Sequence, residues 1–218
     1  MWTESGNSDA SEAYARALDE CSSISANPAL LDDLSAPSRN IPENILQRYK
    51  ARCMELAGSK KITSEEVREA YREAAANGSA AAAAKLLVEN VASFPSESIR
   101  DGVVDALQSG DPMALVELSS LMSRNDQDPS AVGKYSRSIP VSFAWMLVAC
   151  DIGLDCGSTS FLVRQICIFG SICGSGTLQD VVQQRVLTPA DFRNVMEVRN
   201  DLRWIISSGE YFRLFDKK

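Results

Sequence analysis

Cysteine is the residue type whose number and spacing say most about chemistry in this sequence. There are six cysteines and no histidine. Four of the cysteines follow the spacing C-x5-C-x10-C-x5-C, whereas zinc sites normally show C-x2–4-C pairs or histidines. The pattern therefore predicts disulfide bonds rather than a metal site. The cysteines are Cys21, Cys53, Cys150, Cys156, Cys167 and Cys173.

The pairing of these cysteines is predicted only in part. Cys21 and Cys53 lie in the first two long amphipathic segments, so we expect a disulfide between those two helices. The other four allow three pairings, which the sequence does not separate. Three glycines in segment 170–176 predict a loop there, tethered through Cys173.

Disulfides indicate an oxidising compartment, so we expect a periplasmic or secreted protein. The alternative is a cytoplasmic protein whose thiols are free and buried in a helical core. The polar residues after Met1 do not form a signal peptide. An exported origin would therefore mean a mature chain with an added start methionine.

Two carboxylates lie inside the string Cys150-Asp-Ile-Gly-Leu-Asp-Cys156. One interpretation is a small disulfide-closed turn that presents Asp151 and Asp155 as a recognition element or weak cation site. The other is a cross-linked hairpin turn with solvated acids. Farther along, Trp204 and Arg203 lie beside the main apolar stripe of a C-terminal helix. Trp204 is expected to be either partly buried or an exposed anchor for a partner.

The absence of histidine removes the usual general base and the usual catalytic triads. No nucleotide-binding glycine motif occurs, so no cofactor is predicted. The remaining enzymatic option is a pair of carboxylates, as in glycoside hydrolysis. Its candidates have simpler roles in helix caps and turns. They are Glu65, Glu66, Asp151 and Asp155.

The net charge is −7, from 29 acidic and 22 basic residues, and no Lys/Arg-rich run appears. A nucleic-acid partner is therefore not expected. The longest apolar stretches fall short of the roughly 20 residues that a membrane span needs. The acidic surplus either attracts a basic partner or simply keeps a helical surface soluble.

Helix start and stop signals recur along the whole chain, and no stretch alternates as a strand does. Thr63-Ser-Glu-Glu66 is a capping box, and Asn77-Gly78 ends the helix that it starts. Asp111-Pro112 starts another helix. Further helices are expected at about 9–21, 45–57, 140–150, 161–169 and 177–184, and the longest at 188–209.

Residues 68–86 are similar to residues 100–118 at an offset of 32 residues, which indicates a repeated helical hairpin. Arginine, alanine, glycine, alanine and leucine recur, and Glu69 and Glu73 match Asp101 and Asp105 in charge. The identical pairs are Arg68/Arg100, Ala74/Ala106, Gly78/Gly110, Ala82/Ala114 and Leu86/Leu118.

The pattern A-x3-G-x3-A-x3-L resembles the tetratricopeptide superfamily, particularly its short Sel-type repeats. The resemblance covers about residues 64–123, and 140–173 loosely. It implies a scaffold that binds a protein or peptide. Exported members of the Sel-type family often hold their hairpins together with disulfides, which suits the cysteines here.

The expected architecture is all-α: stacked antiparallel hairpins, solenoid-like or an irregular helical array, in a single domain over 1–218. Its expected parts are an N-terminal helical cap, two repeat-like hairpins, a polar insertion, a cysteine-rich hairpin and a C-terminal helical cap. Their bounds are 1–60, 61–124, 125–139, 140–176 and 177–218. We expect a non-enzymatic interaction module, such as an inhibitor or immunity-type protein of a bacterium; the alternative is a small all-α hydrolase of cell-wall glycan.

Overall fold

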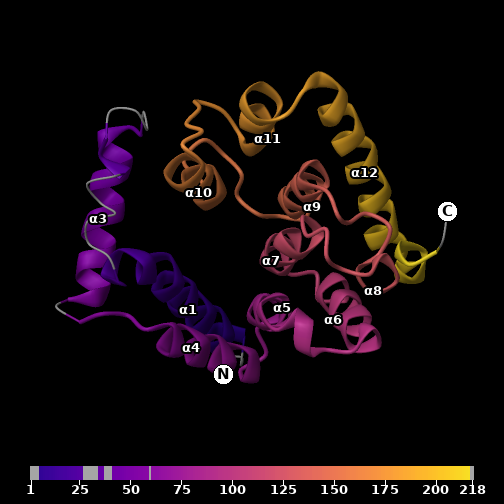
Figure 1. The fold of residues 1–218 in the computed structure, drawn as a ribbon, viewed down its shortest axis with the longest axis horizontal. Helices are drawn as coiled ribbons and strands as arrows, with labels where there is room; N and C mark the ends of the chain where they lie inside the picture. Colours follow the sequence, from indigo (N-terminus) through magenta and orange to yellow (C-terminus); the bar gives the residue numbers. More distant parts are fainter. Residues whose placement is uncertain (1–4, 27–33, 37–40, 59, 217–218) are drawn as a thin grey trace. The chain divides into compact units, whose positions relative to one another are not determined.

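The computed structural model describes residues 5–26, 34–36, 41–58 and 60–216 (Figure 1). These residues form helices and connecting turns without a strand, which confirms the all-α prediction. The sequence also predicts a short helical turn that begins at Asn27-Pro28, and this segment lies mostly outside the described residues. The helices are α1 (Ser5–Ala26), α3 (Glu43–Ala57), α4 (Ser64–Ala76), α5 (Ala80–Glu89), α6 (Ser96–Gln108), α7 (Pro112–Met122), α8 (Pro129–Val132), α9 (Ile139–Asp151), α10 (Phe161–Gly170), α11 (Leu178–Val181) and α12 (Pro189–Ser208).

Three short helical segments complete the described chain. They are the 3₁₀ turn η2 (Val91–Ser93), the π-helical turn η3 (Val182–Val186) and the 3₁₀ turn η4 (Tyr211–Leu214). None of the helices in the described ranges is both long and apolar enough to cross a membrane.

The helices group into two compact units, each described by itself below. Unit 1 comprises Met1–Ser79 and Cys156–Val181, and unit 2 comprises Ala80–Asp155 and Val182–Lys218. The helices α4 and α5, which the 32-residue repeat places in one hairpin, fall in different units. So do α9 and α10 of the expected cysteine-rich hairpin, and the single-domain layout stays a prediction.

Unit 1 is organised around α1, which packs against α4 and α3. Its buried face carries Ala15, Leu18 and Cys21, spaced three residues apart. Tyr14, which the periodicity places on the apolar face, is instead 55% exposed. At 22 residues α1 is also longer than α12, which has 20, so the prediction that α12 is the longest helix is wrong.

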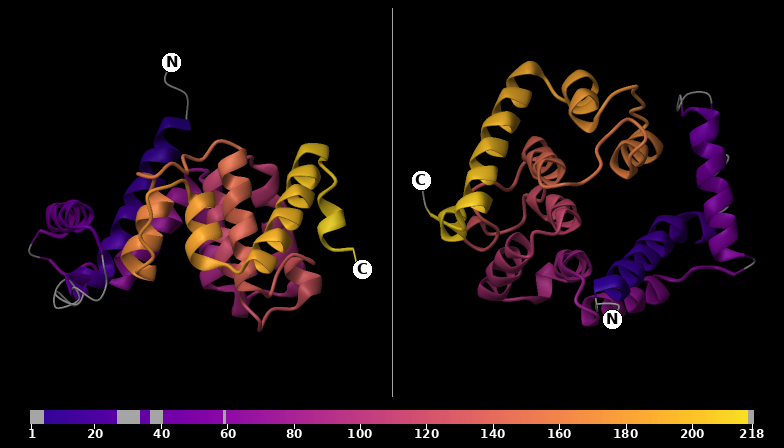
Figure 2. Two further views of the ribbon diagram at one scale, coloured as in Figure 1. Left: turned by 90° about the horizontal axis from the view of Figure 1, so that it is seen from above. Right: turned by 180° about the vertical axis from the view of Figure 1, so that it is seen from behind.

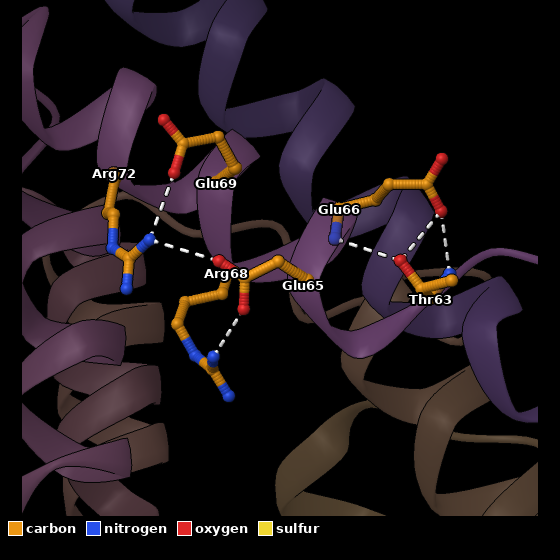
Figure 3. Close-up of polar contacts among 6 residues, drawn as sticks. All are labelled: Thr63, Glu65, Glu66, Arg68, Glu69 and Arg72. Carbon is orange, nitrogen blue, oxygen red and sulfur yellow. Dashed lines mark hydrogen bonds and ion pairs between the residues drawn. The ribbon is translucent and has the colours of Figure 1, made fainter.

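The start of α4 is closed by the predicted capping box (Figure 3). The Glu66 backbone N–H donates to Thr63 Oγ1 at 3.2 Å, and the Thr63 backbone N–H donates to the Glu66 carboxylate at 2.7 Å. This reciprocal pair satisfies two backbone donors that a helix start leaves open. On the surface of the same helix, Arg72 bridges Glu65 and Glu69.

Unit 2 is a series of packed neighbours: α5 with α7, α7 with α9, and α9 with α12. Figure 2 shows α9 and α12 from two further directions. Trp145 on α9 is fully buried, and its indole N–H donates to the Tyr135 carbonyl at 3.0 Å. The buried indole therefore has the polar partner that it needs.

The polar segment 125–139 is an ordered excursion that packs back onto unit 2. It contains α8, which packs against α6, and it buries Val132 completely. Its Lys134 backbone N–H donates to the Leu214 carbonyl at 2.8 Å, and the Tyr135 hydroxyl donates to Asp201 on α12. Burial, and then the hydrogen bond with Asp201, raise the pKa of Tyr135.

Asp111 caps two helices with one carboxylate. Its Oδ1 accepts from the Met113 backbone N–H of its own helix at 2.8 Å. Its Oδ2 accepts from the Ala81 backbone N–H at the start of α5, at 3.2 Å. Negative charge is favourable at both helix starts, so this side chain ties α5 to α7.

Thr63→Ala should lower the free energy of unfolding by about 1 kcal/mol, because it removes the N-cap acceptor of α4. Urea unfolding followed by circular dichroism measures this. Ser64→Ala is the matched control, since Ser64 is exposed and starts the same helix. Equal effects of the two substitutions would contradict the capping role.

The same cap gives a pH prediction. The backbone N–H and then the hydroxyl of Thr63 hold the pKa of Glu66 below its usual 4.5. A lowered pKa contributes stability above the unfolded value, and this stability is lost as pH falls through the folded pKa. The stability difference between wild type and Glu66→Gln should therefore be present at pH 6 and shrink below about pH 4.5.

Gly133→Ala should destabilise the protein more than Gly78→Ala. Both glycines have left-handed φ angles, 96° and 92°, so both alanines are strained by about 1 kcal/mol. Only at Gly133 would the new Cβ lie 2.5 Å from Leu214 Cγ, and Leu214 is fully buried. We expect about 2 kcal/mol of further loss from overpacking. Equal losses would show that the C-terminal turn does not pack there in solution.

Candidate functional site

All six cysteines are in disulfides. Cys21–Cys53 joins α1 to α3 and confirms the predicted link. Cys167–Cys173 closes the glycine-rich loop after α10. Cys150 and Cys156 are also disulfide-bonded, and no free cysteine remains among them. Because disulfides persist where the surroundings are oxidising, the chain belongs to an oxidising environment.

Asp151 is engaged by arginines of α12. Arg199 makes two hydrogen bonds to its carboxylate, at 2.7 and 2.5 Å, and Arg203 lies 3.5 Å away. Although residue Asp151 is exposed as a whole, its side chain and that of Arg199 are each 15% exposed. The hydrogen bonds from Arg199 to Asp151 raise the pKa of the guanidinium. This pair ties α9 to α12 within unit 2.

Of the other predicted recognition residues, Arg203 and Trp204 make separate contacts. Asp155 is exposed. Trp204 is 46% exposed, and Arg213 stacks over its ring at 4.7 Å. Arg203 is 55% exposed and joins Asp151 rather than Trp204. Their roles in recognition stay predictions.

Unit 2 carries an open groove between α6 and the C-terminal turn η4, with a volume of about 720 Å³. We call it the acidic groove, because it is lined by the exposed carboxylates of Asp101, Asp105 and Asp216. Its aromatic side is formed by Tyr211, Phe212 and Phe215. Phe212 is 65% exposed, more than packing in a core would leave it.

The one cation that lines the acidic groove is held in place by unit 2 itself. The Arg100 guanidinium donates to the Ser130 carbonyl of the excursion at 3.0 Å. It also stacks over the Phe215 ring at 5.3 Å. The three carboxylates therefore keep their charge facing solvent, and the groove presents aromatic surface beside negative charge.

Unit 1 carries a smaller cavity of about 230 Å³ where α1, α3 and α10 meet. We call it the arginine pocket, because Arg48, Arg52 and Arg164 line it together with one carboxylate, Glu20. The Glu20 side chain is only 7% exposed and pairs with Arg52 at 3.1 Å. Gln165 of α10 also donates to this carboxylate, at 2.9 Å.

The aromatic side chain of Tyr49 connects the helices that line the arginine pocket. The Tyr49 hydroxyl donates to the Glu20 backbone carbonyl at 2.7 Å, and its ring meets Phe169 edge-on at 5.9 Å. Burial and then the charge of Glu20 raise the pKa of Tyr49, while Arg52 opposes the shift. The tyrosine therefore stays protonated and keeps α1 and α3 together.

Sequence reasoning missed both the groove and the pocket. The arginines of the pocket stand in two helices that are more than 100 residues apart in the chain, and none belongs to a motif. Residues 211–215 belong to the predicted C-terminal cap, and of these Leu214 is fully buried whereas Phe212 is 65% exposed. The usable signal was the i, i+4 spacing of Arg48 and Arg52 on one face of a helix.

The carboxylates do not form an evident catalytic pair in these cavities. Glu20 is the single carboxylate that lines the arginine pocket, and the carboxylates of the groove are exposed. The carboxyl pKa values that shift, those of Glu66, Asp126 and Asp180, all move down, opposite to what a general acid needs. Among the described residues no cluster of three metal-binding side chains occurs.

Comparison with protein-family models, with curated proteins and with solved structures found no match to this chain.

Asp151→Ala should destabilise the protein by about 2 kcal/mol, since it leaves the Arg199 guanidinium without its two charged hydrogen bonds. Thermal and urea unfolding measure this. Asp126→Ala is the control: it removes a similar arginine pair, with Arg124, that is largely solvated. We expect no measurable change there. A stable Asp151→Ala variant would instead favour a recognition role for this residue.

Proposed function

We propose that the chain is a non-enzymatic protein-binding module, and that the acidic groove of unit 2 binds a basic segment of its partner protein. The observation that carries the proposal is the combination of the exposed Phe212 ring, with Tyr211 and Phe215 beside it, and exposed carboxylates along one open groove. Aromatic side chains supply binding energy in protein interfaces, and complementary charge supplies specificity and rate.

The charge of the groove favours a basic partner. Three carboxylates line it against one arginine, and that arginine is already held by Ser130 and Phe215. A lysine or arginine side chain of a partner can pair with Asp101 or Asp105. Its aliphatic stem can then cover the exposed ring of Phe212. The net charge of −7 also steers a basic partner toward the chain.

The disulfides support an exported protein, periplasmic or secreted, and an inhibitor or immunity-type role in a bacterium is one form of this proposal. The resemblance to Sel-type repeats points the same way, toward a scaffold. In the structure, α6 starts 32 residues after α4, and α7 starts 32 residues after α5.

A glycan hydrolase has less support, because neither cavity pairs a desolvated carboxyl group with a second carboxylate.

Panning a random peptide display library against the intact chain tests this proposal. We expect the selected peptides to be rich in lysine and arginine and to bind more weakly as salt rises. Asp101→Asn/Asp105→Asn should weaken the selected peptides at least tenfold. Phe212→Ala should weaken them by a similar factor.

The repeat supplies a matched control, Glu69→Gln/Glu73→Gln. This variant removes two exposed carboxylates at the same spacing, at the positions that correspond by the 32-residue offset. We expect it to leave binding nearly unchanged. Equal weakening by the two double variants, or selected peptides without basic residues, would overturn the assignment of the groove.

A further inference from the structure

The arginine pocket has a surplus of positive charge inside an acidic protein. Three guanidinium groups line it, and Glu20 is the one carboxylate among the lining residues. The pocket therefore carries a net charge of about +2, because arginines stay protonated at neutral pH. The chain as a whole is at −7. A local excess of this sign concentrates anions at the pocket.

Pairing within the fold accounts for only one of the three arginines. Arg52 pairs with Glu20. Arg164 donates to the Thr159 carbonyl, which is neutral. Arg48 has no hydrogen bond, ion pair or ring contact among the described residues.

The remaining lining is mostly apolar and the space is small. Ile45, Phe161 and Ile168 contribute hydrocarbon surface beside the arginines. The volume of about 230 Å³ lies below the range of about 300–1,000 Å³ for drug-sized ligands. The pocket thus suits a compact molecule with an anionic end and an apolar body.

Disulfides hold the walls of the pocket in place. Glu20 and Arg52 immediately precede Cys21 and Cys53, which are bonded to each other. Cys167, between the lining residues Gln165 and Ile168, is bonded to Cys173. A preformed site loses less entropy on binding, so this arrangement favours tight recognition of a small ligand.

We propose that the arginine pocket binds a small organic dianion, in which a dicarboxylate or phosphate monoester group meets Arg48, Arg52 and Arg164. The planar guanidinium fork matches carboxylate and phosphate oxygens equally well. The apolar body of the ligand lies against Phe161 and its neighbours. This site is independent of the acidic groove, because its residues belong to the other unit.

Glu20 has a distinct part in this site. Its carboxylate orients Arg52 and accepts from Gln165, yet it also repels an incoming anion. Replacing it with glutamine removes the negative charge and leaves one carbonyl oxygen that can accept from Arg52 or Gln165. A positioning residue that only held the fold together would not show tighter ligand binding when it is neutralised.

Isothermal titration calorimetry of the oxidised full chain tests the proposal, with phenyl phosphate and phthalate as dianions. Inorganic phosphate serves as a probe that lacks the apolar body, and benzoate serves as a probe that lacks the second negative charge. We expect both dianions to bind more tightly than either probe. Arg48→Met should weaken them at least tenfold, and Glu20→Gln should strengthen them several-fold.

Arg68→Gln is the control for general charge effects, since Arg68 lies in the same unit on the exposed surface of α4. It should change the affinity by less than twofold. Circular dichroism and thermal unfolding of each variant verify that it is folded before titration. No binding of either dianion at millimolar concentration, equal losses in Arg48→Met and Arg68→Gln, or weaker binding in folded Glu20→Gln would overturn the proposal.

Discussion

The disulfide between Cys21 and Cys53 is the constraint on which unit 1 depends. It joins α1, the helix that α3 and α4 both pack against, to α3. In the chain-entropy model, closing a loop of this length stabilises the fold by about 4 kcal/mol, a large part of the stability of a small domain. It also fixes the neighbouring Glu20 and Arg52, and through them one wall of the arginine pocket.

The helix starts could be predicted from the sequence because their causes are local. Thr63, Thr177 and Thr188 each exchange hydrogen bonds with the acidic residue three positions later, as the capping pattern requires. Which helices become neighbours could not be predicted in this way. Tyr14 shows the difficulty. Its spacing along the helix suits the buried face, yet the residues that the fold buries are Ala15, Leu18 and Cys21.

The candidate sites could not be predicted for a related reason, since they depend on tertiary neighbours. Arg68 and Arg100 occupy the same place in the repeat, but Arg68 pairs with Glu65 on its own helix. Arg100 instead reaches Ser130 and Phe215 and becomes part of the acidic groove. The repeat pattern alone predicts the same role for both arginines, whereas their tertiary neighbours give each of them different contacts.

The structure describes a helical protein in which all six cysteines are in disulfides, and disulfides persist in an oxidising environment. Non-reducing peptide mapping by mass spectrometry of protein isolated from its native source tests this claim most directly. The account predicts a Cys21–Cys53 cross-linked peptide and a closed loop between Cys167 and Cys173, with no alkylatable thiol before reduction. Six free thiols, or Cys21 bonded to another cysteine, would contradict it.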